Sequence, residues 1–250
     1  MTIERRSGRN RCAASVFDYD EEMSRTARDV DGLLRMLDEI FPSPQPFWDD
    51  FYADRDRAVP FFVTSPDENL VSYVDEGLLE PGRALDFGCG AGRNAMHLAA
   101  TGFDVDAVDL SETAIAWARE RAPEIRFRQG DAFTLDLAGP YDLIYDSGCF
   151  HHLAPHRRIS YLDLVDRLLA PGGHLAMTCF VTGADNTGAE LPDADLYRQG
   201  ALHGGLAYSP DELRAIFAHL TPVEIRPMRA QPPGSPVFGE DFLQAALFRR

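Results

Sequence analysis

The chain contains no lysine, because all 24 of its basic residues are arginine. This absence excludes a lysine Schiff base, lysine-bound pyridoxal phosphate and a phosphate-binding loop that ends in lysine. The four cysteines show no paired spacing, which is typical of free thiols in a reducing cytoplasm. No apolar run approaches the roughly 20 residues that cross a bilayer. The basic start is not followed by an apolar segment, so no secretory signal is expected.

Positive charge is also scarce relative to negative charge. Forty acidic residues against 24 basic ones give a net charge of −16 with the histidines neutral. A nucleic-acid backbone or an anionic membrane needs clustered positive charge, so neither is expected as a partner. The 250 residues, 45% of them apolar, can bury a sizeable core. These features predict a cytoplasmic globular protein and leave its oligomeric state open.

The first 80 residues are predicted to form a tail and a helical cover. Residues 1–20 are polar and charged, which is typical of a poorly ordered chain end. In the cover, 21–80, the apolar residues from Val30 to Phe41 fall on one face of a helix. The prolines of 42–46 are expected to stop this helix. An aromatic stretch follows, and then a second short helix over about 66–76.

The remainder, 81–250, alternates between strand and helix patterns. Strands separated by single helices predict βαβ units, a parallel sheet and a doubly wound α/β fold. A loop-rich insertion at about 181–207 interrupts the alternation and is expected to cover the substrate. Beyond it, Ser209-Pro210 opens a further helix. Strands are expected at 83–87, 105–109, 125–129, 141–146, 174–180, 222–228 and 242–248, and the other helices at 93–100, 112–121 and 156–169.

A glycine-rich loop lies between the first strand and the first helix of this alternation. Its glycines are spaced G-x-G-x-G, starting at Gly88, and their backbone N–H groups can approach a ligand closely. Arg93 stands where the dinucleotide fingerprint requires its third glycine. Asp86 precedes the loop and would repel a diphosphate. The loop therefore favours a cationic aminoacyl ligand over a dinucleotide.

Two further acids follow the next two strands. Asp109 lies 21 residues after Gly88, and an acid at about this distance accepts from the hydroxyls of a ribose. Asp131 could accept from an adenine amino group. Any single acid of this kind could equally be a turn residue or a helix cap. Together with the glycine loop, the three acids predict a ligand that carries a nucleoside and no phosphate.

Over about 80–180 the sequence resembles the class I S-adenosylmethionine-dependent methyltransferases. The glycine motif of that family matches the loop after Asp86, its ribose acid matches Asp109, and its adenine-side acid matches Asp131. The resemblance implies a Rossmann-like sheet of seven strands, the last antiparallel. It also implies S-adenosylmethionine as cofactor and S-adenosylhomocysteine as product. The implied cofactor-binding residues are Asp86, Gly88, Cys89, Gly90, Gly92, Asn94, Asp109, Leu110, Asp131, Ala132, Asp146 and Trp48.

A narrower resemblance is to the thiopurine, thiol and tellurite methyltransferase branch of this family. That branch carries a proline, an arginine three residues later and an aromatic residue three after that. The His151-His152 pair departs from the branch and leaves the methyl acceptor open. The matching residues are Trp48, Gly92, Arg93, Asn94, Pro155, Arg158 and Tyr161.

Methyl transfer is an in-line displacement at an already activated methyl group, so the protein must mainly orient the reactants and exclude water. The aromatic residues of the cover are candidates for a roof over the site, and equally for packing the helices onto the sheet. A thiol acceptor is partly ionised near neutral pH, whereas a hydroxyl or a protonated amine needs a base. The candidates for substrate contact are Phe51, Tyr52, Tyr145, Arg158 and Tyr208.

The candidate catalytic residues follow the fourth expected strand, at the edge where open parallel sheets bind ligands. His152 is the first candidate for a base or a substrate orienter, His151 is the second, and Asp146 lies beside them. The alternatives are a surface or core histidine at either position and, for Arg158, an ion pair on its helix. No spacing typical of metal ligands accompanies these residues, so no metal is expected.

Three functions stay open at this stage. The first is a methyltransferase that acts on the S, N or O atom of a small molecule, with a thiol-type acceptor slightly favoured. The segment Asp146-Ser-Gly-Cys lacks the paired prolines of nucleic-acid amino methyltransferases, which favours a small molecule over a nucleic acid as the methyl acceptor. The second is a nicotinamide-dependent oxidoreductase on a Rossmann fold, which Asp86 and Arg93 disfavour. The third is a non-catalytic nucleoside-binding protein.

Overall fold

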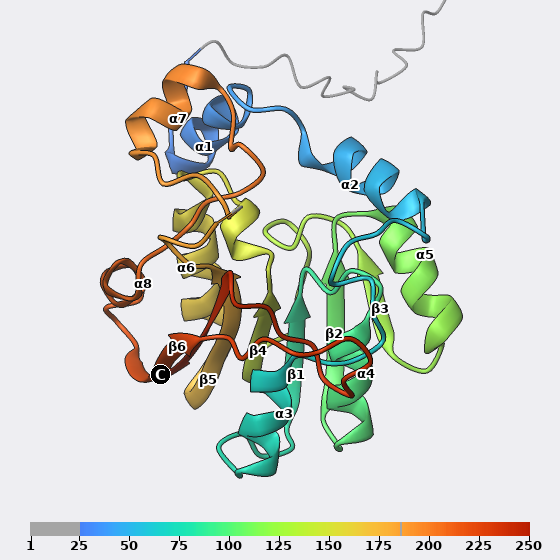
Figure 1. Ribbon diagram of the computed structural model, residues 1–250. Coiled ribbons are helices and arrows are strands. Elements are labelled where there is room, and N and C mark those ends of the chain that lie inside the picture. The colour runs from blue at the N-terminus through green and yellow to red at the C-terminus, as the bar shows by residue number, and fades with distance from the viewer. Residues whose placement is uncertain (1–25, 186) are drawn as a thin grey trace, which may run out of the picture.

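Seven strands form a single sheet in the computed structural model, which describes residues 26–185 and 187–250 (Figure 1). Their order is β3-β2-β1-β4-β5-β7-β6, and β7 runs antiparallel to both of its neighbours while β1 to β5 are parallel. The predicted doubly wound α/β fold is therefore confirmed. The predicted tail, 1–20, lies outside the described residues. The strands are β1 (Arg83–Phe87), β2 (Asp104–Asp109), β3 (Arg126–Gln129), β4 (Tyr141–Ser147), β5 (Leu169–Phe180), β6 (Thr221–Pro227) and β7 (Leu243–Arg249).

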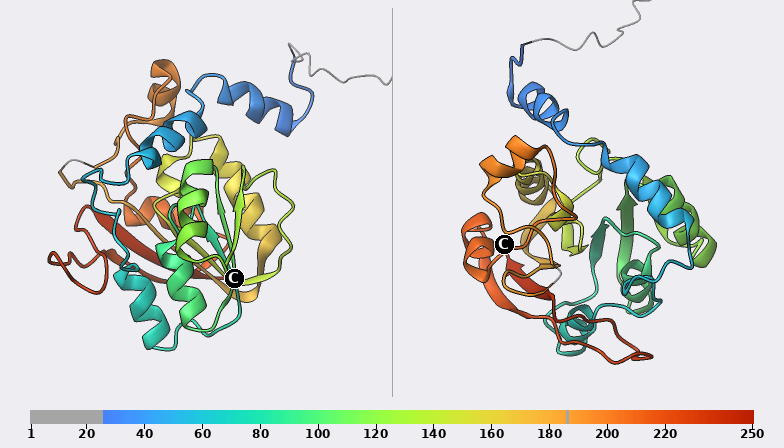
Figure 2. Two further views of the ribbon diagram at one scale, coloured as in Figure 1. Left: turned by 90° about the vertical axis from the view of Figure 1, so that its right-hand side faces the viewer. Right: turned by 45° about the horizontal axis from the view of Figure 1, so that its top comes forward.

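Helices cover both faces of the sheet, as the two turned views show (Figure 2). Successive strand residues point to opposite faces, so Leu85 and Ile144 join one apolar core while Ala84 and Leu143 join the other. The Ala84 core is completed by α3, α4 and α5, and the Leu85 core by α6 and α8. These helices are α3 (Glu68–Asp75), α4 (Arg93–Ala100), α5 (Glu112–Arg121), α6 (Arg157–Leu168) and α8 (Pro210–Ile216).

Three more helices lie beyond the carboxyl ends of the parallel strands, at the top of Figure 1: α1 (Val30–Asp38), α2 (Pro44–Ala53) and α7 (Asp193–Gln199). Helix α2 corrects the sequence prediction, which treated the prolines of 42–46 only as a stop. Two of those prolines occupy the first turn of α2, where a missing N–H leaves no hydrogen bond unmade. Helix α7 lies inside the segment 181–207 that was expected to be loop.

Polar caps mark the starts of two helices of the sheet domain, α5 and α8. Ser111 accepts a hydrogen bond from Ala114 N at the start of α5. Ser209 and Glu212 form a reciprocal capping box at the start of α8, where the sequence predicted a serine cap. None of the helices in the described ranges is long and apolar enough to cross a membrane. The alternation of strands and helices brings the ends of β1, β2, β4 and β5 to one edge of the sheet.

Candidate active site

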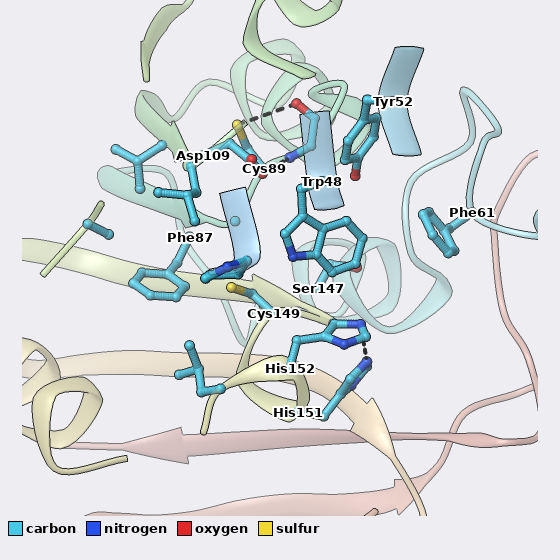
Figure 3. A pocket seen from close by; sticks show the side chains of 18 of the residues that line it. Trp48, Tyr52, Phe61, Phe87, Cys89, Asp109, Ser147, Cys149, His151 and His152 are labelled. Carbon is cyan, nitrogen blue, oxygen red and sulfur yellow. Dashed lines mark hydrogen bonds between the residues drawn. The ribbon is translucent and has the colours of Figure 1, made fainter. Parts of the chain in front are cut away.

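A cavity of about 830 Å³ opens at the edge where the parallel strands end. Its wall combines the ends of β1, β2, β4 and β5 with residues of the segment 38–63 above them. The loop between β6 and β7 adds Phe238 and Phe242. Open α/β sheets bind ligands at this edge, and small-molecule pockets span about 300–1,000 Å³. Figure 3 shows part of the wall.

The glycine loop after β1 contributes backbone to this wall. Gly88, Gly90 and Gly92 have φ values of 69°, 53° and 82°, in the left-handed region that favours glycine. A Cβ atom on Gly90 would overlap the hydroxyl group of Tyr52, so the loop and the cover approach too closely for any side chain. Gly88 and Gly90 line the cavity, whereas Gly92 packs against Phe127 behind it.

Asp86 stands at the base of the glycine loop and is buried. Its Oδ2 atom is buried without a hydrogen-bond partner, while Ala95 N supports the carboxylate from the start of α4. Burial raises the pKa of Asp86 to about 8, assisted by the charge of Asp67 and opposed by that of Arg93. A desolvated carboxyl group with a free oxygen at a cavity wall is suited to receive a cation or a hydrogen-bond donor.

The two other predicted acids also line the cavity. Asp109, at the end of β2, accepts hydrogen bonds of 2.8 Å from Gly90 N and Ser111 N, one on each oxygen. Burial raises the pKa of Asp109 to about 6, and these backbone bonds oppose the shift. Asp131 accepts a bond of 2.9 Å from Phe133 N through one oxygen. Leu110 and Ala132, which follow the two acids, line the cavity as well.

The aromatic stretch of the cover divides between the cavity and packing. Trp48 and Tyr52, on α2, line the cavity, and Trp48 meets the ring of His152 edge-on with 4.9 Å between centroids. Phe51 lies outside the wall and stacks on Phe61 with 5.8 Å between centroids. The two alternatives for this stretch therefore both apply, each to different side chains.

His151 and His152 form a pair on the short 3-10 helix η1 (Phe150–His152), which follows β4. Their Nε2 atoms are 3.0 Å apart, and the Nδ1 atom of His151 lies 3.2 Å from Phe180 N (Figure 3). Both rings line the cavity. Burial lowers the pKa of His152 to about 4, and burial together with His152 holds the pKa of His151 well below its usual value.

Asp146 does not line the cavity, although it was a candidate for catalysis and for cofactor binding. It is buried, and its Oδ1 atom accepts hydrogen bonds from Cys149 N and Phe150 N. The carboxylate thereby holds the turn that carries the histidine pair. Burial raises its pKa to about 7, while those two backbone bonds oppose the shift.

Three of the substrate candidates also lie away from the cavity. Tyr145 points to the opposite core, where its hydroxyl group donates to Asp67 over 2.6 Å. Arg158 donates to the hydroxyl group of Tyr208 over 3.0 Å and forms an ion pair with Asp193 on α7. This ion pair joins α6 to α7, whereas the alternative expected from the sequence was a pair on the helix of Arg158 itself. These three residues border the core or a smaller pocket beside α7 and α8.

Residues 84–173 match the family model described as a methyltransferase domain. The chain carries a methyltransferase domain with the class I fold. A similar sequence is that of "Probable thiol methyltransferase 2" of Arabidopsis thaliana, which is 31% identical over 129 residues, or 49% of this chain and 57% of that protein. The chain spans about half the length of the curated relatives that it matches first.

Solved structures share the fold of this domain. One of them is described by the conversion of a disulfide bond into a thioacetal group during echinomycin biosynthesis. It has a TM-score of 0.64 and 26% sequence identity, and the match covers 83% of this chain and 93% of the other chain. Another is the N-methyltransferase NodS of Bradyrhizobium japonicum with S-adenosyl-L-homocysteine. It has a TM-score of 0.56 and 21% identity over 81% of this chain and 98% of that one. At this identity the second likeness concerns the fold.

The wall of the methyltransferase domain fits the cofactor of its class. The orphaned Oδ2 atom of Asp86 offers an acceptor to a charged amino group, and Gly88 and Gly90 line the same cavity with backbone alone. Asp109 keeps lone pairs for ribose hydroxyls, since each oxygen accepts one backbone bond. Of the other implied residues, Trp48, Cys89 and Asn94 line the cavity, and Gly92 and Asp146 lie behind it.

Several residues of the cavity wall were not predicted from the sequence. Arg93 joins Asp67 in a 2.6 Å ion pair, donates to Ser147 Oγ over 3.0 Å and lies over the ring of Phe238. Its position after the glycine loop could have marked it as a wall residue. Phe238 had no such signal, because it reaches the cavity from a loop more than 140 residues further along the chain. In the described part of the insertion 181–207, Leu202 lines the cavity.

Proposed function

We propose that the protein is an S-adenosylmethionine-dependent methyltransferase that methylates a small molecule, with a thiol-type acceptor favoured over N and O atoms. The observation that carries this proposal is the unpartnered, buried carboxylate oxygen of Asp86 at the base of a glycine cradle. S-adenosylmethionine supplies a methyl group on a sulfonium centre, which makes the group ready for displacement. The protein then has to hold the reactants in line and keep water away.

Each of the three acids has a separate binding role in this proposal. Asp86 accepts a hydrogen bond from the ammonium group of the methionine part, in a desolvated place where such a charge-assisted bond is strong. Asp109 accepts from the ribose hydroxyls, and Asp131 lies on the adenine side. Gly88 and Gly90 let the backbone approach the ligand because no side chain intervenes.

The cover supplies the exclusion of water. Trp48 and Tyr52 from α2 and the segment around Phe61 enclose the cavity from above (Figure 3). Helix α2 is held to the sheet domain by Asp49, whose carboxylate accepts a 2.7 Å bond from Ser111 Oγ. The same Ser111 caps α5 beside Asp109, so the cover and the ribose acid are tied to one helix start.

A thiol-type acceptor is supported by the electrostatics of the wall. The depressed pKa values of His151 and His152 leave both rings neutral at pH 7 and make both of them weak bases. A thiol has a reference pKa of about 8.5 and is partly ionised without a base, unlike a hydroxyl group. The thiol methyltransferase among the relatives supports the same class of acceptor.

The test is the rate of S-adenosylhomocysteine formation with thiols, phenols, amines and carboxylic acids as acceptors. We expect turnover that is fastest with thiols and is lost in Asp109→Ala. The matched control is Asp163→Ala, which removes an exposed acid from α6 and should leave the rate unchanged. No turnover with any acceptor would contradict the proposal, and turnover with only the other classes would contradict the preference for thiols.

A further inference from the structure

The hydrogen bonds of the histidine pair determine which ring nitrogen carries each proton. The backbone N–H of Phe180 faces Nδ1 of His151 at 3.2 Å, and because an N–H can only donate, this Nδ1 must present a lone pair. A neutral imidazole carries its single hydrogen on the other nitrogen, so His151 is protonated on Nε2. That Nε2–H then donates to Nε2 of His152 over 3.0 Å. His152 therefore accepts through Nε2 and carries its own hydrogen on Nδ1.

The ring of His151 is held in this orientation from several sides. It stacks on Phe180 with 3.8 Å between centroids, and its backbone carbonyl accepts a 2.7 Å bond from Leu206 N. A turn of the ring by 180° would put Cδ2 in the place of Nδ1 and Cε1 in the place of Nε2. It would therefore lose the hydrogen bonds to Phe180 N and to His152, which favour the observed orientation.

His152 lies at the cavity wall, between Trp48 and His151 (Figure 3). In the described part of the chain, the hydrogen bond of its side chain is the one to His151, which leaves Nδ1–H for a ligand. We propose that His152 is a hydrogen-bond donor to an anionic methyl acceptor, a thiolate, and that His151 is the positioning residue that fixes this donor tautomer. The assignment of the ligand as the methyl acceptor rests on the proposed function.

This arrangement excludes His152 as a general base. To accept a proton on Nδ1, His152 would first have to carry its hydrogen on Nε2, which faces the Nε2–H of His151. If His151 moved its hydrogen to Nδ1 instead, two donors would face each other at Phe180 N. Either change leaves a buried donor without an acceptor, which is unfavourable.

The thiolate therefore arrives already ionised, and the N–H of His152 favours that charged form. One sulfur lone pair accepts the hydrogen bond and another forms the new S–C bond. The electron pair of the broken S–C bond stays on the leaving sulfur. No proton moves in this step, which matches a site that offers a donor and no base.

The first test reads the tautomers directly. We would label the full-length protein with ¹⁵N-histidine and assign His151 and His152 with His151→Gln and His152→Asn. Long-range ¹H–¹⁵N correlation at pH 7 should show hydrogen on Nε2 of His151 and on Nδ1 of His152. Hydrogen on Nε2 of His152 would overturn the proposal, whether or not the protein transfers methyl groups.

The second test separates a donor from a base. The amide nitrogen of asparagine can replace Nδ1 as a hydrogen-bond donor but cannot act as a base. The rate of His152→Asn with thiophenol should therefore stay within about tenfold of the parent rate, whereas the rate of His152→Phe, which has no donor, should fall further. Equal losses of about 10²-fold or more in both variants would indicate a base and overturn the proposal.

A third measurement needs no turnover and therefore distinguishes the two proposals. Thiophenolate added to the protein with S-adenosylhomocysteine should shift the Nδ1 signal of His152, and His151→Phe should remove both the single tautomer and the shift. His151→Gln, which keeps a donor, should restore them. An Nδ1 signal that does not respond to saturating thiophenolate would refute the donor role. Failure of S-adenosylmethionine to bind would instead contradict the proposed function.

Discussion

The protonation of Asp86 should make cofactor binding depend on pH in a way that can be calculated. The pKa of about 8 means that this carboxyl group is protonated at pH 6 to 7 in the free protein. Pairing with the ammonium group of S-adenosylmethionine requires the carboxylate, so binding at pH 6 should release about one proton. Each unit of pH below 8 then weakens binding about tenfold, which equals about 1.4 kcal/mol. Between pH 7 and pH 6 the Kd should therefore rise about tenfold.

Calorimetry in buffers of different ionisation enthalpy measures both the Kd and the released proton. Asp86→Asn should weaken binding at pH 7 by about 10- to 150-fold, the range of a charge-assisted hydrogen bond, and should abolish proton release. Methylthioadenosine, which lacks the amino group, is the matched ligand control and should show neither effect. An unchanged Kd in Asp86→Asn, or no proton release at pH 6, would refute the role of this carboxylate.

Three further outcomes follow from the same contacts. The pKa of Asp86 in the folded protein lies above its unfolded value of about 3.9, so the parent loses stability as the pH rises from 4 to 8. Asp86→Asn does not undergo this loss. Its melting temperature should therefore exceed that of the parent by a margin that grows over this pH range. Gly90→Ala should lose about 1–2 kcal/mol of stability because of its positive φ, and it should also weaken cofactor binding. Adding Tyr52→Phe should partly restore binding, because this change removes the hydroxyl group that the new Cβ atom overlaps. A double variant that binds no better would contradict the close approach of Gly90 and Tyr52. Asp109→Asn should weaken adenosine and S-adenosylmethionine by the same factor in calorimetry, and an effect on only one of them would argue against ribose binding.

Much of the fold could be predicted because its signals are local. The helices expected at 93–100 and 112–121 have these bounds in the structure, since a glycine turn starts one and Ser111 caps the other. The acids Asp86, Asp109 and Asp131 reach one cavity because parallel strands end at the same edge. Helix α2 was missed because its prolines read as a stop, although the first turn of a helix accepts them.

The side-chain directions within the site depended on contacts that the sequence does not display. Asp146 and Tyr145 are neighbours of the histidine pair in sequence, yet one holds a turn and the other enters the opposite core. Arg158 pairs with Asp193 on α7, a helix that no pattern indicated. The direction of the hydrogen bonds at His151 depends on Phe180 N, which belongs to a distant strand. The roles of these residues in binding and catalysis remain predictions.

Transfer of the methyl group itself can be followed with methyl-labelled S-adenosylmethionine. The protein would be incubated with this donor and a thiol, and the labelled thioether and S-adenosylhomocysteine would both be measured by mass spectrometry. We expect equal amounts of the two products, with both lost in Asp109→Ala. Tight binding of the donor without label transfer to any acceptor would contradict it and indicate a nucleoside-binding protein.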